Sequence, residues 1–121
     1  MSDAIDEQLR EALDQAQFRT TLLKHLANAK LKLEQNLTYA FNGGTFKATP
    51  ELIAFLGVLE KRGLPHGAVV LDLHDRPIII DTVKSFMDEL VKVYDQAMIS
   101  YVVEFRRLVK ARTVAEIVEE Q

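Results

Sequence analysis

The sequence predicts a mainly helical α+β fold, in which a long antiparallel helical hairpin of coiled-coil type carries a small ββαββ tip. Apolar residues recur in steps of three and four at both ends of the 121-residue chain, and neither end contains Gly or Pro. The middle instead contains turn residues and β-branched runs. We expect one domain over residues 1–121 in the order α-ββ-α-ββ-α, with a long helix at 3–37, the tip at 38–81 and a second long helix at 82–119.

The first long helix is predicted from a heptad pattern. Asp6 and Glu7 lie in its first turn, where negative charge complements the helix dipole. The expected seam, with Arg19 and Lys30 at two of its positions, consists of Ile5, Leu9, Ala12, Ala16, Leu23, Leu26, Leu33 and Leu37. At about 1.5 Å per residue the helix would be roughly 50 Å long. We therefore expect it to project or to assemble with another helix.

Two β-hairpins are predicted in the tip. Segments 38–41 and 45–48 flank a turn at Asn42-Gly43, and this dipeptide supplies the positive φ angles that a tight hairpin turn requires. The aliphatic runs 68–73 and 77–80 flank a second polar turn. The two hairpins can together form one small antiparallel sheet.

A short helix and the second long helix complete the predicted elements. The short helix occupies 50–62, because Thr49 is a good N-cap and Pro50 suits the first helical position. The last helix is expected to follow Asp81 as its N-cap and to run uninterrupted. Its seam is Met87, Leu90, Tyr94, Ala97, Tyr101, Leu108, Ala111, Ala115 and Val118, with Glu104 as the one charged interruption.

Charge predicts that the two long helices are antiparallel neighbours. The first fourteen residues are acidic, with a single Arg10, whereas the stretch expected to lie opposite is basic. The acidic residues are Asp3, Asp6, Glu7, Glu11 and Asp14, and the basic residues are Arg106, Arg107, Lys110 and Arg112. Exposed pairs are worth only about 0.2 to 1 kcal/mol each, so this pairing would set orientation more than stability.

The last helix also carries apolar residues beside its seam. These are Phe86, Val93, Val102, Phe105 and Val109. We expect all five to form an interface with another copy or another protein. Cover by the tip is an equal alternative for Phe86 and Val93, whereas the other three lie too far along the helix for it. The sequence therefore predicts a homo-oligomer, and the alternative is that these residues bind a different protein.

Composition excludes several classes of function. A net charge of −3 gives no general attraction to nucleic acid or anionic lipid. The absence of cysteine excludes a disulfide framework, a thiolate metal site and a cysteine nucleophile, and it fits a reducing compartment. The acidic start is unlike a signal peptide, and no segment approaches the roughly 20 apolar residues of a membrane span. We expect a cytoplasmic protein with no membrane partner.

The polar end of the second hairpin is the main candidate for chemistry. Asp72 and His74 project to the same face of a strand, and Asp75 and Asp81 lie near them in the sequence. Such a group could hold a divalent ion or form an acid/base pair, but Asp and His are also common at hairpin turns for conformational reasons. The chain lacks the glycine-rich phosphate loops and the G-x-S-x-G elbow. We expect no catalytic, cofactor or metal site.

A basic cluster supports an alternative function. Arg106, Arg107, Lys110 and Arg112 lie within two helical turns and could follow a phosphate backbone. Acidic residues follow this cluster in the sequence. The cluster can also be explained without a ligand, as a solvated face that pairs with the acidic first helix.

Two resemblances add to these expectations. The order of elements resembles prefoldin-type chaperones, although the short helix at 50–62 departs from that pattern. From residue 41 onward the chain resembles small uncharacterised proteins of T4-like tailed phages, including those of cyanobacteria. The segment that carries this resemblance is Phe41-Asn42-Gly43-Gly44-Thr45-Phe46-Lys47-Ala48-Thr49-Pro50-Glu51-Leu52-Ile53. It implies a viral origin, location in the host cytoplasm or the virion, and a role in particle assembly or in manipulating host machinery.

The predicted function is that of a non-enzymatic, self-associating structural, scaffold or assembly protein, with a phage component as one form of it. The alternatives are a nucleic-acid-associated accessory protein that uses the basic cluster and a prefoldin-like chaperone or adaptor.

Overall fold

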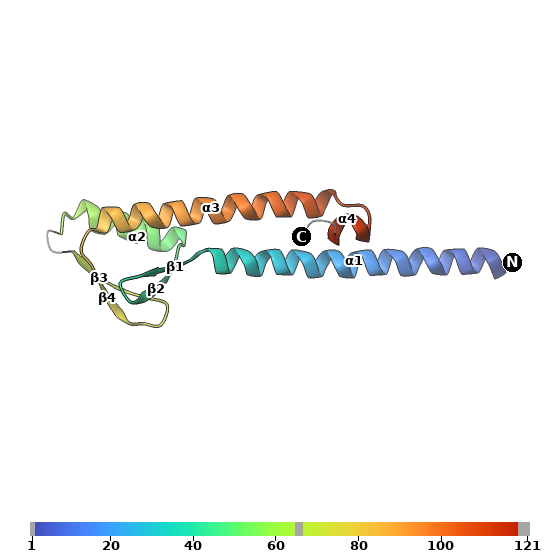
Figure 1. The fold of residues 1–121 in the computed structure, drawn as a ribbon, viewed down its shortest axis with the longest axis horizontal. Helices are drawn as coiled ribbons and strands as arrows, with labels where there is room; N and C mark the ends of the chain where they lie inside the picture. The colour runs from blue at the N-terminus through green and yellow to red at the C-terminus, as the bar shows by residue number, and fades with distance from the viewer. Residues whose placement is uncertain (1, 65–66, 119–121) are drawn as a thin grey trace. The chain divides into compact units, whose positions relative to one another are not determined.

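The fold is mainly helical with two small β-hairpins, as the sequence predicts. The computed structural model describes residues 2–64 and 67–118. Figure 1 shows the order of elements, which are α1 (Ser2–Asn36), β1 (Thr38–Phe41), β2 (Gly44–Lys47), α2 (Pro50–Lys61), β3 (Ala68–Leu71), β4 (Pro77–Ile80), α3 (Val83–Lys110) and α4 (Val114–Val118).

The chain divides into two compact units, which are described separately. The helical unit comprises Met1–Lys32 and Tyr101–Gln121, and the α/β unit comprises Leu33–Ser100. Both long helices contribute residues to each unit. The expectation of a single domain over 1–121 stays a prediction.

In the α/β unit, an aromatic cluster forms the centre of the core. The side chain of Phe86 is only 2 % exposed. Its ring centroid lies 4.9 Å from those of Phe41 and Phe46 and 6.1 Å from that of Tyr39, so α3 is packed against both strands of the first hairpin. Phe86 is therefore a core residue of this unit and is not available as the interface residue that the sequence suggested.

The two hairpins form separate antiparallel two-stranded sheets and not one shared sheet. Asn42 (φ 50°) and Gly43 (φ 83°) make the expected tight turn of the first hairpin. Gly44 allows this hairpin to approach the second, because a Cβ at Gly44 would lie 2.6 Å from Cγ1 of Ile78. The backbone N–H of Leu73 donates to the carbonyl of Thr45 at 2.8 Å and links the two hairpins.

The helix starts in this unit follow the capping rules, with one difference. The backbone N–H of Leu52 donates to Oγ1 of Thr49 at 3.2 Å, so Thr49 is the N-cap of α2 as predicted. At the start of α3, the N–H of Phe86 donates to the carbonyl of Thr82. Thr82, and not Asp81, therefore occupies the N-cap position.

In the helical unit, the core lies between α1 and the segment that runs from the end of α3 into α4. Its buried residues are Ala29, Leu108, Ala111 and Ile117, with Phe18, Leu22, Leu26 and Tyr101 packed against them. This is the expected pairing of the first and last helices, but through a different face of α1. The heptad register predicted from Ile5 and Leu9 is wrong for the N-terminal half of the helix, because both side chains are exposed.

The last helix is not continuous to residue 119, which itself lies outside the described residues. It ends at Lys110, and α4 begins at Val114. Thr113 is the N-cap of α4, because the N–H of Glu116 donates to Oγ1 of Thr113 at 3.2 Å. The Thr113 hydroxyl also donates to Oε1 of Glu116. Figure 1 shows the chain turning from α3 into α4. Ile117 on α4 is fully buried.

We predict that Phe86→Ala strongly destabilises the protein. Truncating a buried Phe removes apolar contacts and leaves a cavity, which costs about 3 to 5 kcal/mol. Phe105→Ala is the matched control, because Phe105 is 42 % exposed and should cost about 1 kcal/mol or less. Urea unfolding followed by circular dichroism measures both, and equal losses would contradict the assignment of Phe86 to the core.

Candidate functional site

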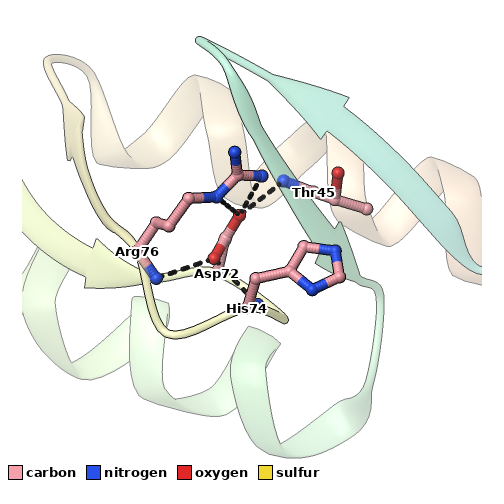
Figure 2. A network of polar contacts seen from close by, with 4 residues as sticks. All are labelled: Thr45, Asp72, His74 and Arg76. Atoms are coloured by element: carbon pink, nitrogen blue, oxygen red, sulfur yellow. Dashed lines mark hydrogen bonds and ion pairs between the residues drawn. The ribbon is translucent and has the colours of Figure 1, made fainter.

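Asp72 is the most highly connected polar side chain at the hairpin tip. It is 6 % exposed. Its Oδ1 accepts from the backbone N–H groups of His74 and Arg76, each at 2.9 Å, and its Oδ2 accepts from the N–H of Thr45 at 3.0 Å. Nε and Nη2 of Arg76 also donate to Oδ2, at 3.1 and 2.9 Å (Figure 2). Five donors thus converge on one carboxylate.

These contacts determine the charge state of Asp72. Burial acts to raise its pKa, but the backbone donors of Thr45, Arg76 and His74 and the Arg76 guanidinium outweigh burial and hold the pKa well below its ordinary value. Asp72 is therefore ionised at neutral pH and is a poor base. Its oxygens are occupied by protein donors, so the carboxylate acts as a structural link between the two hairpins.

The other candidates at this tip do not join Asp72 in a reactive group. His74 contributes its backbone N–H, and its side chain is exposed, as is that of Asp81. Asp75 adopts the left-handed conformation (φ 60°) within the turn and donates its N–H to the carbonyl of Asp72. Among residues 2–64 and 67–118, no group of three or more His, Asp or Glu side chains could hold a metal ion.

The outer face of the second hairpin is apolar. Val69 pairs with Ile79 and Leu71 with Pro77 across the two strands. The side chains of Val69, Leu71 and Ile79 are 64, 58 and 56 % exposed. Cross-strand neighbours on one face of a hairpin contact each other, so this is a continuous apolar surface of the α/β unit.

Two of the four residues in the predicted nucleic-acid cluster are used inside the helical unit. Nη1 of Arg107 donates to the carbonyls of Glu116 and Ile117 at 3.0 and 2.9 Å, and its other nitrogens contact Glu104. Nη1 of Arg112 lies 3.3 Å from each of three carbonyls at the end of α3, those of Val109, Lys110 and Ala111. Arg106 and Lys110 are exposed. Arg107 and Arg112 therefore have a structural role in capping α3 and α4.

The predicted interface strip on α3 divides into two parts. In the α/β unit Phe86 is buried and Val93 is half-buried. In the helical unit Val102, Phe105 and Val109 are 40, 42 and 45 % exposed. These three follow a spacing of three and four residues and form one face of the helix, so they stay a candidate contact surface.

A larger exposed apolar surface lies on α1. We call it the α1 stripe, and it consists of Ile5, Leu9, Leu13, Ala16, Thr20, Leu23, Ala27 and Leu31. Its five large aliphatic side chains are 57 to 65 % exposed. Sequence reasoning found part of this face but assigned it to pairing within the chain. A second apolar series on α1 could have revealed the difference. It consists of Phe18, Leu22, Leu26 and Ala29, and it forms the face of α1 that the rest of the helical unit covers.

The helical unit also contains a groove of about 660 Å³ beside α1. Phe18, Leu22 and Val114 line it with apolar side chains, and Asp14, Arg19 and Arg112 are among its polar residues. Because Arg112 also caps α3, the groove is formed where the chain turns from α3 into α4.

Comparisons with protein-family models, with curated proteins and with solved structures give no significant match to this chain. The resemblances to phage proteins and to prefoldin-type chaperones stay predictions. Within the part of the chain that the structure describes, no helix combines the length and the apolar character needed to cross a membrane.

We predict that Asp72→Asn destabilises the α/β unit. The substituted amide keeps the size of the side chain but brings its own N–H groups toward donors that need an acceptor. The melting temperature should fall, whereas Asp75→Asn, at an exposed position of the same turn, should change it little. Equal melting temperatures for Asp72→Asn and the wild type would contradict the structural role.

The stability of the wild-type protein should also depend on pH through Asp72. Its folded pKa lies below the ordinary value of 3.8, so its contribution is fully present above about pH 5 and is lost as the pH falls toward the folded pKa. Asp72→Asn should lack this component of acid destabilisation. Urea midpoints measured between pH 5 and pH 2.5 test this, and parallel acid profiles for the two proteins would contradict it.

Proposed function

We propose that this chain is a non-enzymatic, self-associating protein that serves a structural or assembly role. The observation that carries the proposal is the α1 stripe, with five large aliphatic side chains on one helical face in contact with water. Full burial of each such side chain is worth about 1.5 to 3 kcal/mol. A continuous apolar face of this length marks a contact surface more often than a free surface.

The faces of α1 explain why its partner is outside the chain. Phe18, Leu22 and Leu26 already pack on the core of the helical unit. The stripe lies on another side of the same helix, and α1 is one continuous helix from Ser2 to Asn36, so its N-terminal half cannot fold back to cover it. The proposal therefore assigns the covering surface to another molecule.

The nucleic-acid alternative receives less support from these contacts. Arg107 and Arg112 are committed to backbone carbonyls, which leaves Arg106 and Lys110 as the freely exposed cations of the cluster. Salt-sensitive retention on single-stranded DNA that is lost in Arg106→Glu/Lys110→Glu would favour this alternative over assembly.

A chaperone or adaptor would use the exposed apolar surfaces to hold a different protein, as prefoldin-type proteins do. The phage origin suggested by the resemblance from residue 41 onward is compatible with an assembly role and remains part of the proposal. A stable mass above that of the 13.7 kDa chain in the purified protein favours self-association over either alternative.

We predict that Leu13→Asp/Leu23→Asp converts an oligomer into a monomer. Two carboxylates in the stripe would be desolvated on association, which is unfavourable without partners. Asn28→Asp is the control, because Asn28 is exposed on a different face of α1. Light scattering coupled to size exclusion measures the mass, and circular dichroism checks that both variants remain helical.

The second candidate surface is tested separately. Phe105→Asp should leave the oligomer intact if the α1 stripe is the contact surface, because Phe105 lies on α3. Loss of the oligomer in Phe105→Asp, with retention in Leu13→Asp/Leu23→Asp, would transfer the assembly role to the surface of Val102, Phe105 and Val109. A wild-type protein that is monomeric at high micromolar concentration would contradict self-association altogether.

A further inference from the structure

We infer that two copies of this chain pair through the α1 stripe in antiparallel orientation, with the two-fold axis beside residue 18. The inference rests on the self-association proposed above, and it adds the surface, the direction and the register of the contact. Three features of α1 lead to it: the spacing of the stripe, the distribution of charge along the helix, and the face that the chain already covers.

The spacing of the stripe is symmetric about residue 18. Its members lie two, five, nine and thirteen residues from this position on both sides, as the pairs Ala16 and Thr20, Leu13 and Leu23, Leu9 and Ala27, and Ile5 and Leu31 show. A two-fold antiparallel pair requires this symmetry, because each residue before the axis meets the residue equally far beyond it in the partner. All eight residues would then lie in the contact.

The pairing also distributes side-chain volume well. Leu9 meets Ala27, and the small residues Ala16 and Thr20 meet at the axis. Small residues there let the helices approach closely, while leucine and isoleucine fill the space farther out. The stripe also repeats every eleven residues, from Ile5 to Ala16 to Ala27, which keeps it close to straight along an α-helix. Two nearly straight helices can therefore stay in contact over about 39 Å.

Charge favours the antiparallel direction over the parallel one. Residues 3–17 carry five acidic side chains and Arg10, whereas residues 18–32 carry four cations and no acidic side chain. The cations are Arg19, Lys24, Lys30 and Lys32. Antiparallel pairing lays each acidic half along a basic half, and parallel pairing lays acid on acid. Complementary charge of this kind selects orientation and suppresses the wrong arrangement more than it adds affinity.

The covered face of α1 leaves the stripe free for this contact. On a helix with about 100° per residue, the stripe is centred roughly two fifths of a turn away from Phe18, Leu22, Leu26 and Ala29. The pairing therefore does not require α3 or α4 to move within the helical unit.

Disulfide trapping tests the direction, and the chain suits this experiment because it contains no cysteine. Leu9→Cys and Ala27→Cys are prepared separately, checked for helicity and mass, mixed and oxidised. We expect a disulfide-linked dimer in the mixture and almost none in either variant alone. In an antiparallel pair the two copies of residue 9 lie about 27 Å apart along the axis, beyond the Cα separation of about 4.4 to 6.8 Å that a disulfide spans.

The control replaces Ala27→Cys by Asn28→Cys, which is one residue away on another face, and the mixture should then give little linked dimer. Efficient linkage of Leu9→Cys with itself would show parallel pairing and overturn the inference while self-association stands. A non-covalent dimer that forms no disulfide in the mixture would place the contact on another surface. This outcome would also overturn the inference while self-association stands. A monomeric protein in all samples would overturn both the inference and the proposed function.

Discussion

The end of α3 at Lys110 is the constraint on which the arrangement of the helical unit depends. Three sets of contacts accompany the end of the helix there: the Thr113 N-cap of α4, the Arg112 guanidinium at the last carbonyls of α3, and Arg107 at the carbonyls of Glu116 and Ile117. With these contacts α4 turns back and buries Ile117. Ile117 then belongs to the core against which Phe18 and Leu22 of α1 pack, whereas residues 3–17 of α1 are exposed.

The sequence predicts most of the secondary structure because the local signals agree. Asn42-Gly43 specifies the first hairpin turn, Thr49 and Pro50 specify the start of α2, and both structures follow. The end of α3 was missed although its signal is present, since Thr113 and Glu116 have the spacing of a capping box. An apolar pattern without Gly or Pro favoured a continuous helix and concealed this competing signal.

The faces of α1 were harder to predict for a different reason. Two apolar series follow the same helix, one through Leu9 and Leu23 and the other through Phe18 and Leu22, and periodicity alone does not say which of them the chain covers. The choice depends on which face of α1 packs against the end of α3 and α4, which is a tertiary property. For Asp72, sequence reasoning found an interesting residue but not its role, because its donors come from Thr45 on β2 as well as from its own turn.

Different physical requirements therefore shape the two units. In the α/β unit, the Asp72 carboxylate and the aromatic rings around Phe86 make their contacts within the unit. In the helical unit, α1 has one face covered by the chain and one face in water, and the second face motivates the assembly proposal. Arg107 and Arg112, two of the four cations in the basic cluster, contribute to the caps of α3 and α4.

The distance between spin labels at residue 28 of two copies tests the central claim most directly. Asn28 is exposed and lies off the α1 stripe, so a label there should not disturb the contact. Antiparallel pairing beside residue 18 separates the two labelled backbone positions by about 30 Å along the helix axes. A distribution centred near that distance would support the account, whereas labels at close range or no intermolecular distance at all would contradict it.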